Sequence, residues 1–123
     1  MGLVKEKVLI ADDNPVNLDI FQEILEDDYD IKMVTDGVQA LDSIKNFMPK
    51  VILLDIMMPK IDGYEVCRQI RAHKELQGVK IIMVSARAME SERLKGIEVG
   101  ADEYITKPFD EDVLLEMVKS HLD

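Results

Sequence analysis

The chain has little of several residues on which common kinds of site depend. Its 123 residues include one cysteine, Cys67, and two histidines, His73 and His121, and no tryptophan. A single cysteine cannot form an internal disulfide, and without a second thiol or clustered histidines it does not indicate a zinc site. We therefore expect a reduced, cytoplasmic setting, with Cys67 as a small core residue.

Positive charge and long apolar runs are also scarce. The chain carries 15 Lys and Arg against 25 Asp and Glu, which gives a formal net charge of −10. This balance weighs against direct binding of nucleic acid or an anionic membrane, and it favours cations and basic protein faces. No apolar run approaches the roughly 18 residues of a membrane span. Since 47% of the residues are apolar, residues 1–123 are predicted to form one domain with its own core.

Short apolar runs rich in β-branched residues alternate with stretches of helical spacing. The runs predict five strands, at residues 7–11, 31–35, 51–55, 80–85 and 103–106. Amphipathic spacing follows each run, as in Leu18, Phe21 and Leu25 after the first. Because the runs are apolar on both sides, they predict a parallel sheet covered on both faces. The predicted fold is therefore α/β, a doubly wound (βα)5 arrangement.

Capping residues mark the predicted helix starts. Asn14, Asp62 and Asp110 each precede a helical stretch, where the side chain can accept a hydrogen bond from the first turn. The fourth helical stretch is the weakest, because it has few apolar anchors and an internal Gly96, which costs about 1 kcal/mol relative to alanine. Gly100 is its expected end. Such a poorly anchored helix is suited to a role that requires movement.

Polar side chains stand where the predicted strands end. Asp12 and Asp13 follow the first strand, Asp55 ends the third, Ser85 ends the fourth and Lys107 follows the fifth. Ligands of open parallel sheets bind beyond the carboxyl ends of the strands, so we expect these residues to meet at one edge. Asp55 ends a run of four apolar residues, where an ionised carboxylate costs free energy unless it is paired, metal-bound or open to solvent.

Three carboxylates at one edge repel one another, so a cation is needed to neutralise them. Oxygen ligands without histidine or thiol favour a hard divalent ion, Mg²⁺, which keeps water ligands that phosphate oxygens can replace. Lys107 adds a second positive charge and Ser85 a hydroxyl donor. Together these groups predict a phosphoryl group on Asp55.

Four motifs in the order LIADDN, LLDIMMPKIDG, VSA and YITKPF together resemble the receiver domain of two-component response regulators, over essentially the whole chain. The resemblance implies the flavodoxin-like strand order 2-1-3-4-5. It also implies a phosphorelay function, in which a sensor histidine kinase or a histidine phosphotransfer protein donates the phosphoryl group. A downstream effector protein or an attached output domain would respond, and phosphorylation could produce a dimer. Such a domain promotes its own phosphorylation and dephosphorylation and is not a turnover enzyme.

The same resemblance assigns roles around the phosphoryl group. Asp55 corresponds to the phosphoacceptor and Lys107 to the active-site lysine, whose peptide bond to the following proline is cis in relatives. Mg²⁺ would be held by Asp13 directly, by Asp12 through water, by Asp55, and by the backbone carbonyl of Met57.

Other positions correspond to the switch and to control of hydrolysis. Ser85 matches the switch hydroxyl, and Tyr104 matches the aromatic that turns inward in the active form, which changes the face of the fourth helix, fifth strand and fifth helix. Met57 and Arg87 lie two residues past Asp55 and Ser85. These positions influence the access of water in relatives, and two large side chains here predict slow self-dephosphorylation.

Three other interpretations remain to be weighed. A haloacid-dehalogenase-type phosphatase would have a second aspartate two residues after the nucleophile, where this chain has Met57. A flavin-binding carrier would have a phosphate loop after the first strand, where the acidic segment ADDNPVN would repel a phosphate. A pseudo-receiver that is never phosphorylated is disfavoured by the complete set of polar residues. The cognate kinase, the output and the extent of the whole protein stay open.

Overall fold

The computed structural model describes residues 4–122, which form a parallel sheet of five strands. The strand order is β2-β1-β3-β4-β5, so the predicted doubly wound order is confirmed. The strands are β1 (Lys7–Ala11), β2 (Asp30–Val34), β3 (Val51–Leu54), β4 (Lys80–Ser85) and β5 (Glu103–Thr106).

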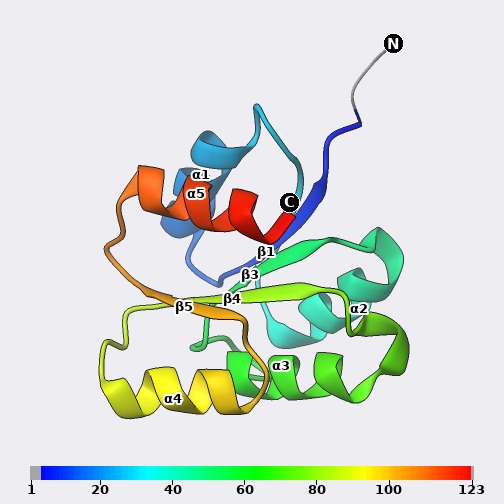
Figure 1. The fold of residues 1–123 in the computed structure, drawn as a ribbon, viewed down its shortest axis with the longest axis vertical. Helices are drawn as coiled ribbons and strands as arrows, with labels where there is room; N and C mark the ends of the chain where they lie inside the picture. The colour runs from blue at the N-terminus through cyan, green and yellow to red at the C-terminus, as the bar shows by residue number, and fades with distance from the viewer. Residues whose placement is uncertain (1–3, 123) are drawn as a thin grey trace.

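Helices cover both faces of the sheet. They are α1 (Pro15–Leu25), α2 (Gly37–Phe47), α3 (Gly63–Ala72), α4 (Glu90–Glu98) and α5 (Glu111–Leu122), with a short 3-10 helix η1 (Lys74–Leu76) after α3. Helices α1 and α5 lie on one face, and α2, α3 and α4 lie on the other (Figure 1). Among residues 4–122, no helix is both long and apolar enough to cross a membrane.

The apolar strands build two separate cores because their side chains alternate between the faces. Val8 and Ile10 of β1 pack on the side of α1 and α5, with Phe21 and Leu114. Leu9 and Ala11 pack on the other side, with residues of α2 and α3. This is why the strand sequences show apolar runs in place of a polar alternation.

The predicted caps hold the helix starts. The side chain of Asn14 accepts the Val16 N–H at 2.9 Å, and that of Asp62 accepts the Glu65 N–H at 2.9 Å. Asp110 accepts the Asp112 N–H at 2.8 Å. Helix α4 lacks a side-chain cap, and its only buried residue is Gly96, so it is as weakly anchored as its sequence predicts.

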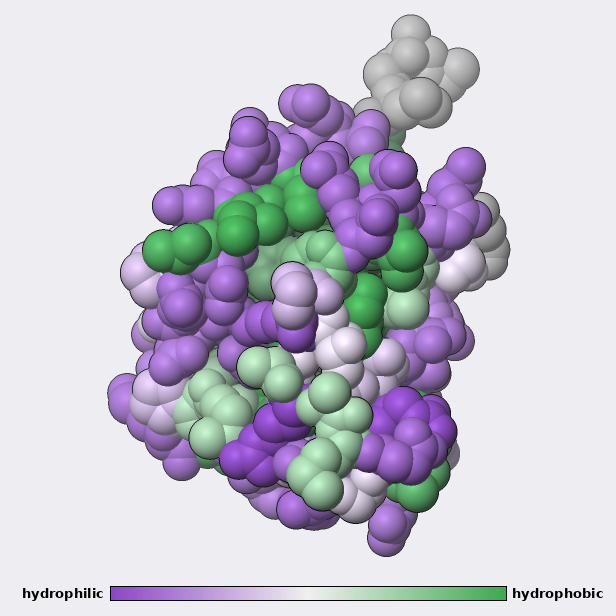
Figure 2. All heavy atoms as spheres, turned by 90° about the vertical axis from the view of Figure 1, so that its left-hand side faces the viewer, coloured by the Kyte–Doolittle hydropathy of each residue, from purple (hydrophilic) through white to green (hydrophobic). Residues whose placement is uncertain are grey.

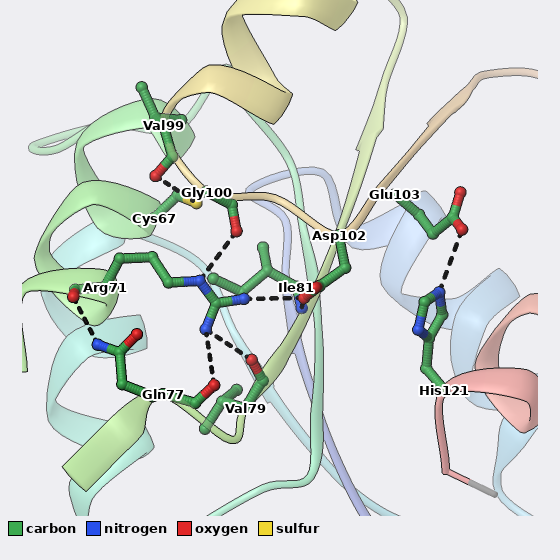
Figure 3. A network of polar contacts seen from close by, with 10 residues as sticks. All are labelled: Cys67, Arg71, Gln77, Val79, Ile81, Val99, Gly100, Asp102, Glu103 and His121. Carbon is green, nitrogen blue, oxygen red and sulfur yellow. Dashed lines mark hydrogen bonds and ion pairs between the residues drawn. The ribbon is translucent and has the colours of Figure 1, made fainter. Parts of the chain in front are cut away.

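An arginine contacts the segments that lead into β4 and β5 (Figure 3). These are the amino ends of the two strands, opposite to the carboxyl ends where the predicted site lies. The guanidinium of Arg71, on α3, donates to the carbonyls of Val79 at 2.8 Å and Gly100 at 2.9 Å. It also pairs with the Asp102 carboxylate at 2.8 Å, and that carboxylate accepts the Ile81 N–H at 2.8 Å. One side chain therefore links α3, the start of β4 and the loop between α4 and β5.

Candidate functional site

Three aspartates meet at the carboxyl edge of the sheet. Asp12 and Asp13 follow β1 and Asp55 follows the adjacent strand β3. One carboxylate oxygen from each residue lies within 4.8 Å of the others. Asp12 and Asp55 are buried, with exposures of 1% and 8%, whereas Asp13 is open to solvent. Such a set of oxygen ligands, partly open to water, fits a hard divalent cation.

Lys107 supplies positive charge to the two buried carboxylates. Its ammonium lies 2.7 Å from Asp12 Oδ2 and 3.2 Å from Asp55 Oδ2. The lysine follows β5, and its backbone N–H donates to the Ser85 carbonyl at 2.8 Å, which ties it to the end of β4. The peptide bond from Lys107 to Pro108 is cis, as the resemblance implied.

The turn after β1 orients Asp12. Its Oδ1 accepts the Asn14 N–H at 2.9 Å, while the Asn14 side chain caps α1. The cap is thus supplied by Asn14, which leaves the second oxygen of Asp12 for Lys107 and leaves the Asp13 carboxylate facing solvent.

The loop after β3 turns closely around Asp55. Asp55 Oδ1 accepts the Met57 N–H at 3.3 Å, and the Gly63 N–H donates to the Ile56 carbonyl at 2.8 Å. A Cβ atom at Gly63 would collide with the Asp55 carbonyl oxygen. The glycine therefore lets the start of α3 approach the loop that carries Asp55.

The environment of Asp55 disfavours its charge. Burial raises the pKa of its carboxyl above the usual value, the Lys107 ammonium opposes this rise, and the Asp12 carboxylate adds to it. Lysine and a bound cation would both favour the ionised form, which is the form that can act as a nucleophile.

Ser85 and Tyr104 lie on neighbouring strands. Ser85 is fully buried at the end of β4, and its Oγ accepts the Arg87 N–H at 3.1 Å. The Tyr104 hydroxyl donates to the Arg87 carbonyl at 2.7 Å. A Cβ atom on Gly96 would lie only 3.1 Å from the Tyr104 ring, so the glycine that weakens α4 also makes room for this aromatic side chain.

Arg87 lies between the loop after β3, which carries Asp55 and Met57, and helix α4. Its Nη2 is 3.0 Å from the sulfur of Met57, and its Nη1 pairs with Glu92 at 3.0 Å. Glu92 in turn accepts a hydrogen bond of 3.4 Å from the Tyr64 hydroxyl. The two positions expected to control water access are therefore in direct contact with each other.

An apolar groove of about 680 Å³ adjoins Lys107. It is lined by Ile20 and Ile24 of α1 and by Phe109, whose ring stacks on Phe21 with centroids 5.4 Å apart. Figure 2 looks onto this side of the molecule and shows apolar side chains gathered in its upper half, bordered by hydrophilic ones. The carboxyl edge of the sheet therefore has an apolar groove beside the charged side chains of Lys107 and the aspartates.

A sequence model of the response regulator receiver domain matches residues 8–119. The chain belongs to the response regulator receiver family. Response regulator MprA of Mycobacterium sp. (strain KMS) is 37% identical over 115 residues, covering 94% of this chain and 49% of that protein. This receiver therefore spans about half the length of the curated relatives that it matches.

Solved receiver structures agree in sequence and fold. The receiver domain of sensor histidine kinase PA1611 from Pseudomonas aeruginosa, with magnesium coordinated in its active-site cleft, is 31% identical, with a TM-score of 0.89 and coverage of 97% of this chain and 98% of that one. A CheY-like receiver protein from Methanospirillum hungatei is 34% identical, with a TM-score of 0.88 and coverage of 97% and 94%. The BeF3-activated DrrB receiver domain is 32% identical, with a TM-score of 0.87 and 98% coverage of both chains.

Membership of the receiver family decides against the phosphatase and the flavin carrier. The structure brings together Asp12, Asp13, Asp55 and Lys107, with the Met57 backbone adjoining Asp55. Ser85 and Tyr104 lie beside this cluster and are linked to each other through hydrogen bonds to the Arg87 backbone.

Two residues of the surrounding network, Tyr64 and Glu92, were not found by sequence reasoning. They lie 28 positions apart and are joined only by tertiary packing. The only signal in the sequence is the acidic first turn of α4, which is common at helix starts.

Proposed function

We propose that this receiver domain accepts a phosphoryl group on Asp55 from a phosphohistidine of a sensor histidine kinase or a histidine phosphotransfer protein. The observation that carries the proposal is the position of Asp55. Its carboxylate lies at the carboxyl edge of the sheet, 3.2 Å from the Lys107 ammonium. One of its oxygens lies within 4.8 Å of a carboxylate oxygen of Asp12 and of Asp13.

In the transfer, an Asp55 carboxylate oxygen attacks phosphorus in line with the phosphorus–nitrogen bond of the phosphohistidine. That bond breaks, its electron pair stays on the imidazole nitrogen, and an aspartyl phosphate forms. Lys107 would then pair with a phosphoryl oxygen, since its ammonium already reaches the Asp55 carboxylate. Such transfers depend mainly on position and charge stabilisation.

Mg²⁺ fits the acidic residues of the site. The carboxylates of Asp12, Asp13 and Asp55 and the carbonyl of Met57 would hold it, directly or through water. A related receiver was solved with a magnesium ion coordinated in its active-site cleft. When bound, the ion neutralises charge on the phosphoryl oxygens.

The response to phosphorylation would pass through Ser85 and Tyr104. A phosphoryl oxygen would attract the Ser85 hydroxyl, which lies next to the Arg87 N–H. The Tyr104 ring lies beside Gly96 of α4, and its hydroxyl donates to the Arg87 carbonyl. Phosphorylation would shift the population toward the form in which this ring is turned inward. The face of α4, β5 and α5 would then present a different shape to a downstream effector, an attached output domain or a second copy of the receiver.

The test is phosphorylation by a small donor. Wild-type protein incubated with acetyl phosphate and Mg²⁺ should gain the mass of one phosphoryl group, and excess chelator should prevent this. Asp55→Asn should gain none. Equal labelling of this variant would overturn the choice of acceptor, and an unlabelled wild type would favour the pseudo-receiver.

A further inference from the structure

Helix α4 is held at its two ends by different arginines. At its carboxyl end, Arg71 donates to the Gly100 carbonyl at 2.9 Å (Figure 3). At its amino end, the Glu92 carboxylate accepts a bond of 3.0 Å from Arg87. Only the second anchor adjoins the loop after β3 that carries Asp55, because Arg87 also lies 3.0 Å from the sulfur of Met57 in that loop.

The two arms of the Arg87 guanidinium have unequal partners. Nη1 donates to the Glu92 carboxylate, which is a strong, charged acceptor. Nη2 faces the Met57 thioether, which is a weak acceptor. A phosphoryl oxygen on Asp55 would therefore attract the Nη2 arm away from sulfur more readily than it would attract Nη1 away from Glu92.

Glu92 is itself held in place by α3. The Tyr64 hydroxyl donates to the Glu92 backbone carbonyl at 3.2 Å and to its carboxylate at 3.4 Å. The Lys95 ammonium lies 4.3 Å from the centre of the Tyr64 ring, which adds a cation–π contact between the same two helices. The Glu92 side chain is only 20% exposed, so its carboxylate has a defined position.

We propose that Glu92 is a positioning residue that orients Arg87 toward the phosphoryl group on Asp55. This inference rests on the proposed phosphorylation of Asp55. With Nη1 fixed on Glu92, the Nη2 arm extends across the mouth of the site, where it pairs with a phosphoryl oxygen and obstructs the water that would hydrolyse the acyl phosphate. The same contact links the phosphoryl group through Arg87 to the first turn of α4.

Removing the Glu92 charge has two separable effects. It frees Arg87, which reduces the protection of the phosphoryl group, and it removes a negative charge near an anion, which acts whether or not Arg87 is present. A double-mutant cycle between Glu92→Gln and Arg87→Ala isolates the first effect. Glu90→Gln is the matched control, since Glu90 lies in the same helical turn but pairs with Arg93 at 2.6 Å.

The experiment follows decay of the phosphorylated state by intact mass after the phosphodonor is removed. We expect Glu92→Gln to shorten the lifetime by about threefold in the wild-type background and by less than about 1.5-fold in the Arg87→Ala background. Glu90→Gln should leave the lifetime unchanged, and Glu92→Asp, which restores the charge, should recover part of the loss.

Two results would overturn the inference while leaving the proposed function in place. One is normal labelling with equal lifetimes for Glu92→Gln and wild type, and the other is an equal effect of Glu92→Gln in both backgrounds. Failure of the wild type to take up any phosphoryl group would contradict the proposed function and this inference with it.

Discussion

Arg71 offers a strong test of how the fold is held together away from the site. The substitution Arg71→Ala removes three hydrogen bonds of 2.8 to 2.9 Å, to Gly100, Val79 and Asp102. The side chains of Arg71 and Asp102 are 19% and 29% exposed, so water replaces these bonds only in part. The Asp102 carboxylate would keep only its bond to the Ile81 N–H among the bonds described here.

The expected loss follows from the net value of these bonds. With roughly 1 kcal/mol for each neutral acceptor and somewhat more for the charged one, Arg71→Ala should lower the free energy of unfolding by about 2 to 4 kcal/mol. For a domain of this size that corresponds to a fall in Tm of about 8 to 16 °C. Arg71→Lys should recover little of the lost stability, because a single ammonium cannot reproduce the planar set of donors of the guanidinium.

The assay is thermal and urea unfolding of purified protein, with Arg68→Ala as the control. Arg68 lies on the same helix, but it is 53% exposed and pairs only with the exposed Glu65 among the contacts described, so its loss should matter little. Phosphorylation of Asp55 should persist in Arg71→Ala, since Arg71 lies at the opposite sheet edge. The reasoning fails if Arg71→Ala destabilises the protein no more than Arg68→Ala.

Three further predictions concern the site itself. Asp13→Ala should abolish Mg²⁺-dependent labelling and leave the Tm unchanged or higher, because it removes a carboxylate from the cluster; labelling at the wild-type rate would place the metal elsewhere. Asp55→Asn should be more stable than wild type at pH 7.5. Burial raises the pKa of Asp55 in the folded protein, so the folded state loses stability relative to the unfolded chain as the pH rises through that pKa and the carboxyl ionises. The stability advantage of Asp55→Asn should shrink as the pH falls toward the ordinary aspartate pKa of about 4. An advantage that grows on acidification would refute this prediction. Met57→Asn and Arg87→Ala should each shorten the lifetime of the phosphorylated state by about threefold to tenfold. The lifetime is measured as loss of the added phosphoryl mass over time, and unchanged decay in both variants would show that neither side chain obstructs water.

Much of the fold could be predicted because the apolar runs of the sequence coincide with the strands of the sheet. The segments 7–11, 80–85 and 103–106 are strands with the predicted bounds. The second strand begins and ends one residue earlier than predicted, and the third ends at Leu54, because Asp55 already turns into the loop. Hydrophobic patterning sets which residues are buried, but it does not determine where a ladder's last hydrogen bond lies.

The convergence of Asp12, Asp13, Asp55 and Lys107 could be predicted because the carboxyl ends of parallel strands meet at one edge of the sheet. The cap of α2 was missed: Asp36, which follows directly after the predicted second strand, accepts the Gln39 N–H at 2.8 Å. Contacts such as Arg71 with Asp102 and Tyr64 with Glu92 join residues about 30 positions apart. No local pattern encodes such pairs, since they depend on how α3 and α4 lie against each other.

The most direct test of the account is to locate the phosphoryl group. Protein treated with acetyl phosphate and Mg²⁺ can be reduced with borohydride, which converts an aspartyl phosphate to homoserine, and then digested and mapped by mass spectrometry. The account predicts homoserine at position 55 alone, with Asp12 and Asp13 unmodified. Modification at either of those aspartates, or none at position 55, would contradict it.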